Sequence, residues 1–331
     1  MLKKDIDKLA SFVASKYDLH GPIKDGNETT IKPIQDVTKL DYSGIIATNS
    51  FKSFFLPIRE ELFSFSAQGG TNNKVLPKSV NSKAIAAWGM TVMDLKALGL
   101  YDLVFAKDPY YQERRENNIV IGISAGAPAK FDEYQVFSMN LEENILEHIP
   151  FDIFLEQNKE GEFHIYSGSS KGRQVLKAVG IEIYENIQFV GLIPEEGLDS
   201  RMVKMNQKVA DSIDQKVWQE IASICLACGK CSQVCPTCFC FDLSEVSEKD
   251  GQVTKQREWG NCFFSGFSEI AGKKTFLKTV KQRLFFWYEH KFVRIPNEYK
   301  APGCVSCLRC YKVCPVGINI IEVLNKLKQD E

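Results

Sequence analysis

Residues 224–236 read ICLACGKCSQVCP, and residues 303–315 read GCVSCLRCYKVCP. In each stretch four cysteines follow the spacing C-x2-C-x2-C-x3-C, and a proline comes directly after the fourth cysteine. The first run contains Cys225, Cys228, Cys231 and Cys235, and the second contains Cys304, Cys307, Cys310 and Cys314. The repeated spacing indicates a duplicated metal-binding unit, around which the rest of the chain is organised.

This spacing is the bacterial ferredoxin signature for [4Fe–4S] clusters. A cubane cluster needs four thiolates, and the two x2 spacings wrap one loop around three of its iron corners. The fourth cysteine of each run lies too far along the chain and ligates the other cluster. The sequence therefore predicts two clusters. The first cysteine set is Cys225, Cys228, Cys231 and Cys314, and the second cysteine set is Cys304, Cys307, Cys310 and Cys235.

Two other uses of cysteine fit the pattern less well. A zinc ribbon needs two C-x2-C pairs and gives no reason for a third cysteine or for the following proline. Disulfides suit a short secreted chain, whereas this chain has 331 residues and starts without a signal peptide. We therefore favour iron–sulfur clusters.

Composition places the chain among ordinary globular proteins. With 44% hydrophobic and 25% charged residues it has enough apolar material for a sizeable core, and its length suits two or three domains. No apolar run approaches the roughly 18 residues of a membrane span. The start, MLKKDIDKLASFVASKY, predicts an amphipathic helix with Leu2, Ile6, Leu9, Val13 and Tyr17 on one face. We therefore expect a cytoplasmic protein without a membrane span.

Cysteine and charge divide the chain in the same place. All 11 cysteines lie at or beyond position 225. From residue 222 onward the chain has 16 Lys and Arg and 11 Asp and Glu, a net charge of +5. Residues 1–221 have 25 Lys and Arg and 31 Asp and Glu, a net charge of −6. An oxidised cube with four thiolates carries a charge of about −2, so two cubes nearly cancel the basic excess. We therefore read the excess as charge compensation and expect no nucleic-acid partner.

The first two hundred residues predict a mixed α/β domain, 1–199. Short apolar runs at 43–50, 82–90 and 118–126 suit buried strands, and 94–105 suits a crossover helix followed by a strand. Residues 152–156 and 162–167 flank NKEG as a hairpin, and 187–193 suits another strand. The glycine runs lack the G-x-G-x-x-G fingerprint of dinucleotide sites.

Residues 200–331 predict an α-helical, ferredoxin-like domain that holds both clusters. A long helix over 200–222, with apolar residues at i+4 spacing, leads into the first cysteine run. The connection between the runs, 236–303, is a long insert for a ferredoxin. Within it, 276–291 predicts an amphipathic helix with Phe276, Val280 and Leu284 on one side. This helix either packs over the clusters, which we favour, or docks a partner.

Cys238, Cys240 and Cys262 are left over from the two sets. One interpretation makes them buried thiols, since a free cysteine behaves as a small hydrophobe. The other makes them ligands of a further metal site, which would need a fourth ligand such as His290 or Asp242. The other histidines occur in no catalytic or metal-binding motif.

Several stretches beyond the cysteines resemble a known family. They are ICLACGKCSQVCPTCFCF, REWGNCFFSGFSEIAG, GCVSCLRCYKVCPVGI and FKSFFLPIREELFSF. From about residue 40 onward the chain is similar to the β subunits of cytosolic sulfhydrogenases and to the corresponding dicluster subunits of anaerobic sulfite reductases. That family has a further cysteine site in its first domain, where this chain carries Thr91, Met93 and Ala125. We therefore do not expect the further site here.

The resemblance implies an iron–sulfur electron-transfer subunit of an anaerobic oxidoreductase. It implies a reductase subunit that binds FAD and NAD(P) on one side, and a catalytic subunit of hydrogenase or sirohaem sulfite reductase type on the other. The preferred interpretation is a non-catalytic relay, because a cubane moves one electron at a time and a flavin converts hydride into single electrons. The alternatives are a sulfur- or sulfite-reducing enzyme subunit with its own substrate site, and a scaffold with structural clusters.

Overall fold

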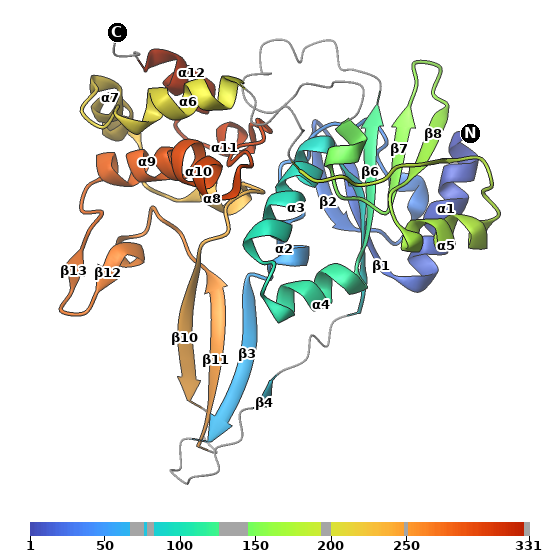
Figure 1. The fold of residues 1–331 in the computed structure, drawn as a ribbon, viewed down its shortest axis with the longest axis horizontal. Coiled ribbons are helices and arrows are strands. Elements are labelled where there is room, and N and C mark those ends of the chain that lie inside the picture. Colours follow the sequence, from blue (N-terminus) through green and yellow to red (C-terminus); the bar gives the residue numbers. More distant parts are fainter. Residues whose placement is uncertain (67–75, 78–82, 126–144, 193–199, 248–250, 328–331) are drawn as a thin grey trace.

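The N-terminal part of the chain is built on a mixed β-sheet (Figure 1). The computed structural model describes residues 1–66, 76–77, 83–125, 145–192, 200–247 and 251–327, and within these ranges the sheet has seven strands in the order β2-β1-β5-β6-β7-β8-β9. Their bounds are β1 (Asp18–Asp25), β2 (Glu28–Pro33), β5 (Ile85–Met90), β6 (Ile119–Ala125), β7 (Ile153–Gln157), β8 (Phe163–Ser167) and β9 (Glu185–Asn186). The mixed α/β architecture predicted for this part is confirmed.

The centre of this sheet is parallel and an antiparallel pair lies on each side of it. β1, β5, β6 and β7 run parallel to one another, β2 and β8 pair antiparallel with β1 and β7, and the edge strand β9 runs parallel to β8. The strands predicted at 82–90 and 118–126 are confirmed over β5 and β6, while residues 82 and 126 lie outside the described residues. The hairpin of 152–156 with 162–167 is also confirmed. β5 and β6 read as nearly continuous apolar runs because helices cover both faces of the sheet.

Two pairs of helices cover the two faces (Figure 1). α1 (Lys3–Lys16) and α5 (Ser170–Val179) pack on one face, and α3 (Val92–Val104) and α4 (Pro109–Asn117) lie on the other. Side chains alternate along β6, so that Ile121 packs with the α1 core and Val120 with the α3 core. α1 buries Ile6 and Leu9 as predicted, and each such side chain contributes about 1.5–3 kcal/mol.

Three strand predictions in this part are wrong, and the first of them concerns 43–50. Residues 43–50 form no strand, because the side-chain amide of Asn49 bonds both the backbone N–H and the carbonyl of Ile31, at 2.8 and 3.0 Å. Asn49 thereby fills the edge of β2 where another strand would add.

The other two wrong strands concern 94–105 and 187–193. The chain over 94–104 is entirely helical, because Leu95, Leu98 and Tyr101 keep a helical spacing and all pack into the same core. Residues 187–192 leave the sheet directly after β9, and Phe189 and Val190 are exposed there. Residue 193 lies outside the described residues.

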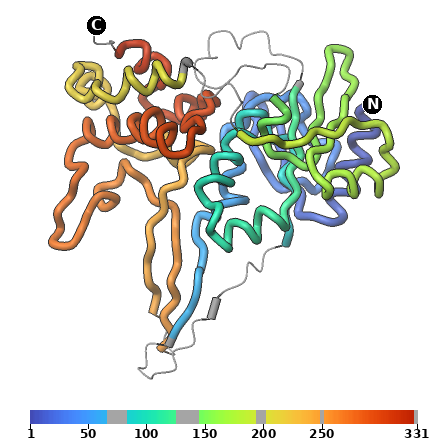
Figure 2. Tube along the Cα trace, in the orientation of Figure 1, coloured from blue at the N-terminus to red at the C-terminus, as the bar shows by residue number. Residues whose placement is uncertain are grey.

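A second sheet joins distant parts of the chain. Its order is β10-β11-β3-β4, with β3 (Arg59–Ser66) and β4 (Leu76–Pro77) from the first part and β10 (Phe241–Ser247) and β11 (Gln252–Trp259) from the insert. β3 pairs antiparallel with β11, and Figure 2 shows this blue strand beside two orange ones in an arm that projects from the body. The predicted division at 199/200 falls in 193–199, outside the described residues, and stays a prediction.

The C-terminal part has short helices around the cysteine runs and also contributes β10 and β11 to the second sheet. The α-helical, ferredoxin-like domain expected for 200–331 stays a prediction. The helices in this part are α6 (Ser200–Ala210), α7 (Lys216–Ile224), α8 (Lys230–Val234), α9 (Val280–Glu289), α10 (Ile295–Tyr299), α11 (Arg309–Lys312) and α12 (Ile320–Lys326), with a π-helical turn η4 (His290–Arg294) between α9 and α10. The remaining short elements are α2 (Lys52–Phe55), β12 (Glu269–Ile270), β13 (Lys274–Thr275) and the 3-10 turns η1 (Val37–Lys39), η2 (Ile145–His148) and η3 (Ser265–Ser268).

Two helices in this part differ from the prediction. The single helix expected over 200–222 is wrong, because the chain turns between α6 and α7, where the buried indole of Trp218 donates to the carbonyl of Ser212 at 2.6 Å. The helix expected over 276–291 begins only at Val280, since Thr279 and Gln282 form a capping box. Its residues Leu284, Trp287 and Tyr288 are buried, which agrees with the packing interpretation.

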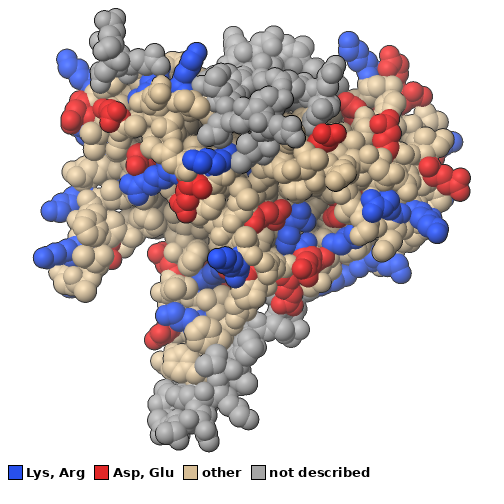
Figure 3. All heavy atoms as spheres, viewed as in Figure 1, with Lys and Arg blue, Asp and Glu red and all other residues tan. Residues whose placement is uncertain are grey.

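Among the described residues, no helix combines the length and the apolar character that crossing a bilayer requires. On the face drawn in Figure 3, Lys and Arg side chains are interspersed with Asp and Glu.

Candidate metal centre

The two cysteine runs fold as copies of one loop. Ala227 and Ser306, each two residues after the first cysteine, have φ of 49° and 55°, and Gly229 and Leu308, two residues further on, have φ of 72° and 55°. The short helices α8 and α11 follow in each copy. A left-handed conformation costs a residue other than glycine about 1–2 kcal/mol. Both runs have a strained, non-glycine residue at equivalent positions. This indicates that each loop is held in a conformation that directs its cysteine sulfurs towards one point.

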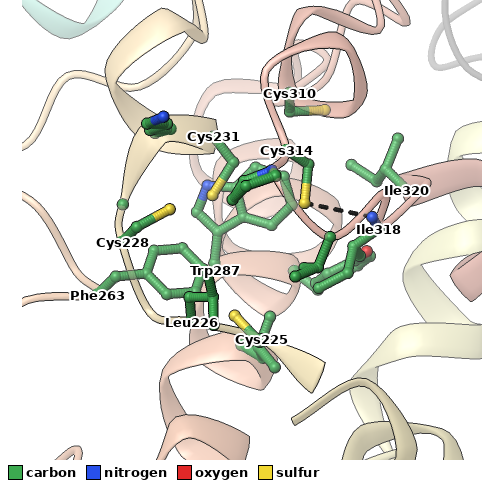
Figure 4. Close-up of a pocket in the computed structure, with 16 residues that line it drawn as sticks. Cys225, Leu226, Cys228, Cys231, Phe263, Trp287, Cys310, Cys314, Ile318 and Ile320 are labelled. Atoms are coloured by element: carbon green, nitrogen blue, oxygen red, sulfur yellow. Dashed lines mark hydrogen bonds between the residues drawn. The ribbon is translucent and has the colours of Figure 1, made fainter. Parts of the chain in front are cut away.

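The first cysteine set lines a single hollow. The space has a volume of about 530 Å³, including its opening to solvent, and the first three cysteines of run one meet Cys314 and Cys310 of run two around it. Figure 4 shows the sulfurs of the first cysteine set gathered near the Trp287 ring, with Cys310 apart from them. Backbone N–H groups of Ala227 and Ile318 donate to the sulfurs of Cys225 and Cys314, at 3.4 and 3.2 Å.

The second cysteine set is also brought together, deeper in the protein. Burial raises the pKa of the Cys310 thiol, and the neighbouring thiolates of Cys304, Cys235 and Cys307 raise it further. Cys235 is likewise among the groups that raise the pKa values of Cys304 and Cys307. Each fourth cysteine therefore lies beside the other run, as the crossed assignment expects, while ligation itself stays a prediction.

The spacing of the thiols fits a cube better than a single ion. Among the described residues, no three Cys, His, Asp or Glu side chains come close enough to hold one metal ion. All ligands of one zinc ion lie about 2.0–2.3 Å from the same point, whereas the four thiolates of a cubane each bind a different corner iron. The hollow of the first set is otherwise lined mainly by apolar side chains, so the residues present suit a bulky inorganic cluster.

A buried lysine contacts the second set. The ammonium of Lys291 lies 3.1 Å from the Cys235 sulfur and also donates to the Thr237 hydroxyl and the Gly303 carbonyl, at 2.9 and 3.2 Å. Burial alone would lower the pKa of Lys291, but the thiolates around it raise that pKa well above its usual value. A side chain on Gly303 would overlap the Lys291 carbonyl, at 2.2 Å from its Cβ, so this position requires glycine.

A buried ion pair ties the second run to the first part of the chain. The Arg309 guanidinium donates to both carboxylate oxygens of Asp94, at 2.6 and 3.1 Å, and to the carbonyl of Ala47 at 2.8 Å. Asp94 lies in the first turn of α3, where the Thr91 side chain caps the helix. The carbonyl of Ala47 is available because 43–50 is not a strand. This contact holds α11 and its cysteines against the N-terminal sheet domain.

The left-over thiols lie next to the second set and do not form a separate group. Cys238 is in hydrogen-bond contact with Cys235, and Cys240 is among the charged neighbours of Cys262. Asp242 lies near Cys240. The His290 ring stands between Phe239 and Phe286, and burial lowers its pKa to about 4. Both interpretations of these three thiols, as buried packing residues and as metal ligands, stay predictions.

Sequence reasoning missed Lys291, Thr237 and the Arg309–Asp94 pair. Two signals were present. Lys291 lies within FFWYEHKF, where every other residue except Glu289 is aromatic, and Arg309 stands inside the second run where the first run has Lys230. Lys230 is exposed, whereas Arg309 is buried, so the two copies differ in burial at this position.

Comparison with known proteins agrees with this geometry. Residues 224–318 match the family model of a 4Fe-4S dicluster domain. The chain is 27% identical over 332 residues to sulfhydrogenase 2 subunit beta of Pyrococcus furiosus, an alignment that covers 94% of this chain and 92% of that protein. No solved structure matches the chain. The predicted resemblance to sulfhydrogenase β subunits is confirmed, and the chain is a homologue of that protein with a 4Fe-4S domain near its C-terminus.

Proposed function

We propose that this protein is an iron–sulfur electron-transfer subunit that relays single electrons between two partner subunits of an oxidoreductase complex. The dicluster domain and the homology support such a role in a hydrogenase-type complex. One partner would bind FAD and NAD(P). The other would be the catalytic subunit, of hydrogenase or sirohaem sulfite reductase type. The observation that carries the proposal is the pair of interleaved four-thiol sets, because two adjacent one-electron centres make a relay.

Each set supplies four thiolates to one [4Fe–4S] cluster, two clusters in all. Each cluster site takes its fourth cysteine from the other run, so both runs must be folded before either site is complete. Cys310 of the second set lies near Cys231 of the first, which makes the sets immediate neighbours. When bound, the clusters supply one-electron redox chemistry.

The cysteines of the two sets would leave no iron with a free coordination position for a substrate. With four thiolates in each set, every iron corner has a protein ligand and none is left for a substrate. Apolar side chains such as Phe263, Leu284 and Trp287 line the first hollow and limit access of water. Cys228 is exposed at its mouth. The arrangement suits electron transfer through the protein surface, with no substrate bound to iron.

A second candidate function follows from a smaller pocket. Cys238 and Cys240 line it together with Phe105, Arg257 and Trp259. Two thiols in one pocket would suit a sulfur or sulfite substrate, which would make this protein an enzyme with its own site. The guanidinium of Arg257 is already paired with Glu60 and Asp108. The relay remains the preferred function because each four-thiol set is complete without these cysteines.

The test adds the components one at a time. Cluster absorbance is followed anaerobically after NAD(P)H is added to the isolated protein, then with a flavoprotein reductase subunit, then with the catalytic subunit plus its substrate. We expect bleaching only after the flavoprotein is present, because a one-electron centre does not accept hydride. Reoxidation should need the catalytic subunit. Direct bleaching by NAD(P)H, or turnover of sulfite, sulfur or protons by the isolated protein, would refute the relay.

A further inference from the structure

The surroundings of the two cysteine sets differ in charge. Lys291 is 2% exposed, and its ammonium contacts the Cys235 sulfur of the second set. Its other hydrogen-bond partners, the Thr237 hydroxyl and the Gly303 carbonyl, are neutral. Within the described ranges no carboxylate is paired with this ammonium. The positive charge of Lys291 is therefore left to act on the sulfur of the second set.

Two other buried cations lie near the second set. One is Lys52, whose ammonium donates to the carbonyl of Ser232 and lies over the Trp259 ring, and the other is Arg309. Arg309 makes two hydrogen bonds to the carboxylate of Asp94, so the pair carries almost no net charge.

Lys230, at the position in the first run that corresponds to Arg309, is exposed to solvent. Solvent screens such a charge strongly. Of the two buried lysines near the second set, Lys291 is the one whose ammonium contacts a ligand sulfur, and the charge of Lys52 acts in the same direction.

Side-chain contacts to sulfur show the same difference, whereas backbone contacts do not. Backbone N–H groups donate to Cys225 and Cys314 of the first set and also to Cys304 and Cys307 of the second. In the second set, Cys235 has three polar side chains in contact with its sulfur, from Lys291, Thr237 and Cys238. Net charge, hydrogen bonds to the sulfurs and solvent exposure all set the reduction potential of an iron–sulfur cluster.

Reduction adds one negative charge to a cluster, so a nearby cation favours it. Inside a protein, a unit charge a few ångströms away changes such an equilibrium constant by more than tenfold. At the first set, Cys228 is exposed, so water can stabilise the charge that reduction adds. This effect raises the reduction potential of the first set and so opposes the difference that Lys291 produces. That effect is smaller, because only one of the four ligands of the first set is exposed, whereas Lys291 touches its sulfur directly.

We propose that Lys291 makes the second cysteine set the site of higher reduction potential, so that electron transfer runs downhill from the first set to the second. The proposal rests on the proposed relay, in which a reduced flavin on the partner supplies the electrons. The first set, open at Cys228, would receive each electron. The buried second set would hold it before transfer to the final acceptor.

The experiment is an anaerobic redox titration of the full chain with dithionite and mediators, followed by electron paramagnetic resonance. It needs no partner, so its outcome is independent of whether the relay test succeeds. The variants are Lys291→Gln, which removes the charge and keeps a hydrogen-bond donor, Lys291→Arg, which keeps the charge, and Lys230→Gln as the matched surface control.

Lys291→Gln should lower the higher of the two potentials by at least 59 mV, a tenfold change in the equilibrium constant of a one-electron couple. The lower potential should move much less, and Lys291→Arg and Lys230→Gln should stay near the wild type. A shift confined to the lower potential, or no tenfold change in either, would overturn the proposal.

A second measurement does not depend on the Lys291 variants binding iron. Cys235→Ser changes one ligand of the second set and should alter the resonance signal of the centre that is reduced first as the potential falls. If the signal that changes belongs instead to the centre reduced last, the assignment of the higher potential to the second set is wrong.

Discussion

Removing the charge of Asp94 should destabilise the protein far more than its small change in volume suggests. Asp94 and Arg309 are 2% and 0% exposed, and their charged groups are joined by hydrogen bonds of 2.6 and 3.1 Å. Asp94→Asn keeps the shape but leaves the Arg309 guanidinium buried without a counter-charge. We therefore expect the variant to fold less stably and the second cysteine run to lose its anchor on α3.

The magnitude follows from the geometry. Two unit charges about 4 Å apart at an effective dielectric constant near 20 attract by about 4 kcal/mol. Measured losses for breaking a buried pair at one partner are about 3–5 kcal/mol. Asn still accepts a hydrogen bond from Arg309, so we expect a loss of about 3 kcal/mol in the free energy of unfolding.

The assay is anaerobic urea unfolding, followed in parallel by circular dichroism and by cluster absorbance. Asp25→Asn is the matched control, because Asp25 pairs with Lys32 at 3.1 Å on the surface, where the two side chains are 72% and 46% exposed. Exposed pairs are worth about 0.2–1 kcal/mol. The double variant Asp94→Leu with Arg309→Met should be more stable than Asp94→Asn alone, because it leaves no buried charge.

Two results would refute this reasoning. One is a loss for Asp94→Asn no larger than that for Asp25→Asn. The other is a double variant whose loss equals the sum of the losses of its two single variants, since a coupled pair should be strongly non-additive.

Three further predictions concern the cysteines. Anaerobically purified protein should contain about eight irons per chain. Cys235→Ser should perturb the centre held by the second run, and Cys314→Ser should perturb the centre held by the first. If electron paramagnetic resonance shows that each variant perturbs the centre of its own run, the crossed ligation is wrong. Replacing Cys238, Cys240 and Cys262 together by Ala should leave the iron content unchanged and cost on the order of 1 kcal/mol per residue in unfolding experiments, whereas lost iron would make them ligands.

Local patterns in the sequence were sufficient for much of the fold and for the candidate ligands. The two-residue spacings of the cysteine runs indicated the loops, the hairpin around NKEG indicated β7 and β8, and the period of Ile6 and Leu9 indicated α1. Each of these features depends on residues that are neighbours along the chain. Their conformations therefore follow from local sterics, hydrogen bonding and the periodicity of burial.

The same patterns misjudged segments whose structure depends on distant partners. The apolar run 43–50 suits a strand by composition, but Asn49 occupies the sheet edge and the carbonyl of Ala47 accepts from Arg309. The helix predicted over 200–222 has the right spacing, yet the chain turns at Ser212, where its carbonyl is taken by Trp218. In both cases a specific hydrogen bond outweighs a weak local preference.

The sequence by itself determined the duplicated cysteine loops, the class of metal group they suit and the alternation of helices and strands in the first part. Only the tertiary structure decided that β3 would join the strands of the insert, that Arg309 would pair with Asp94 and that Lys291 would reach Cys235. Arg309 and Asp94 are 215 residues apart. Such contacts form because burial forces charged and polar groups from remote segments to satisfy one another, and no periodicity along the chain records which groups will meet.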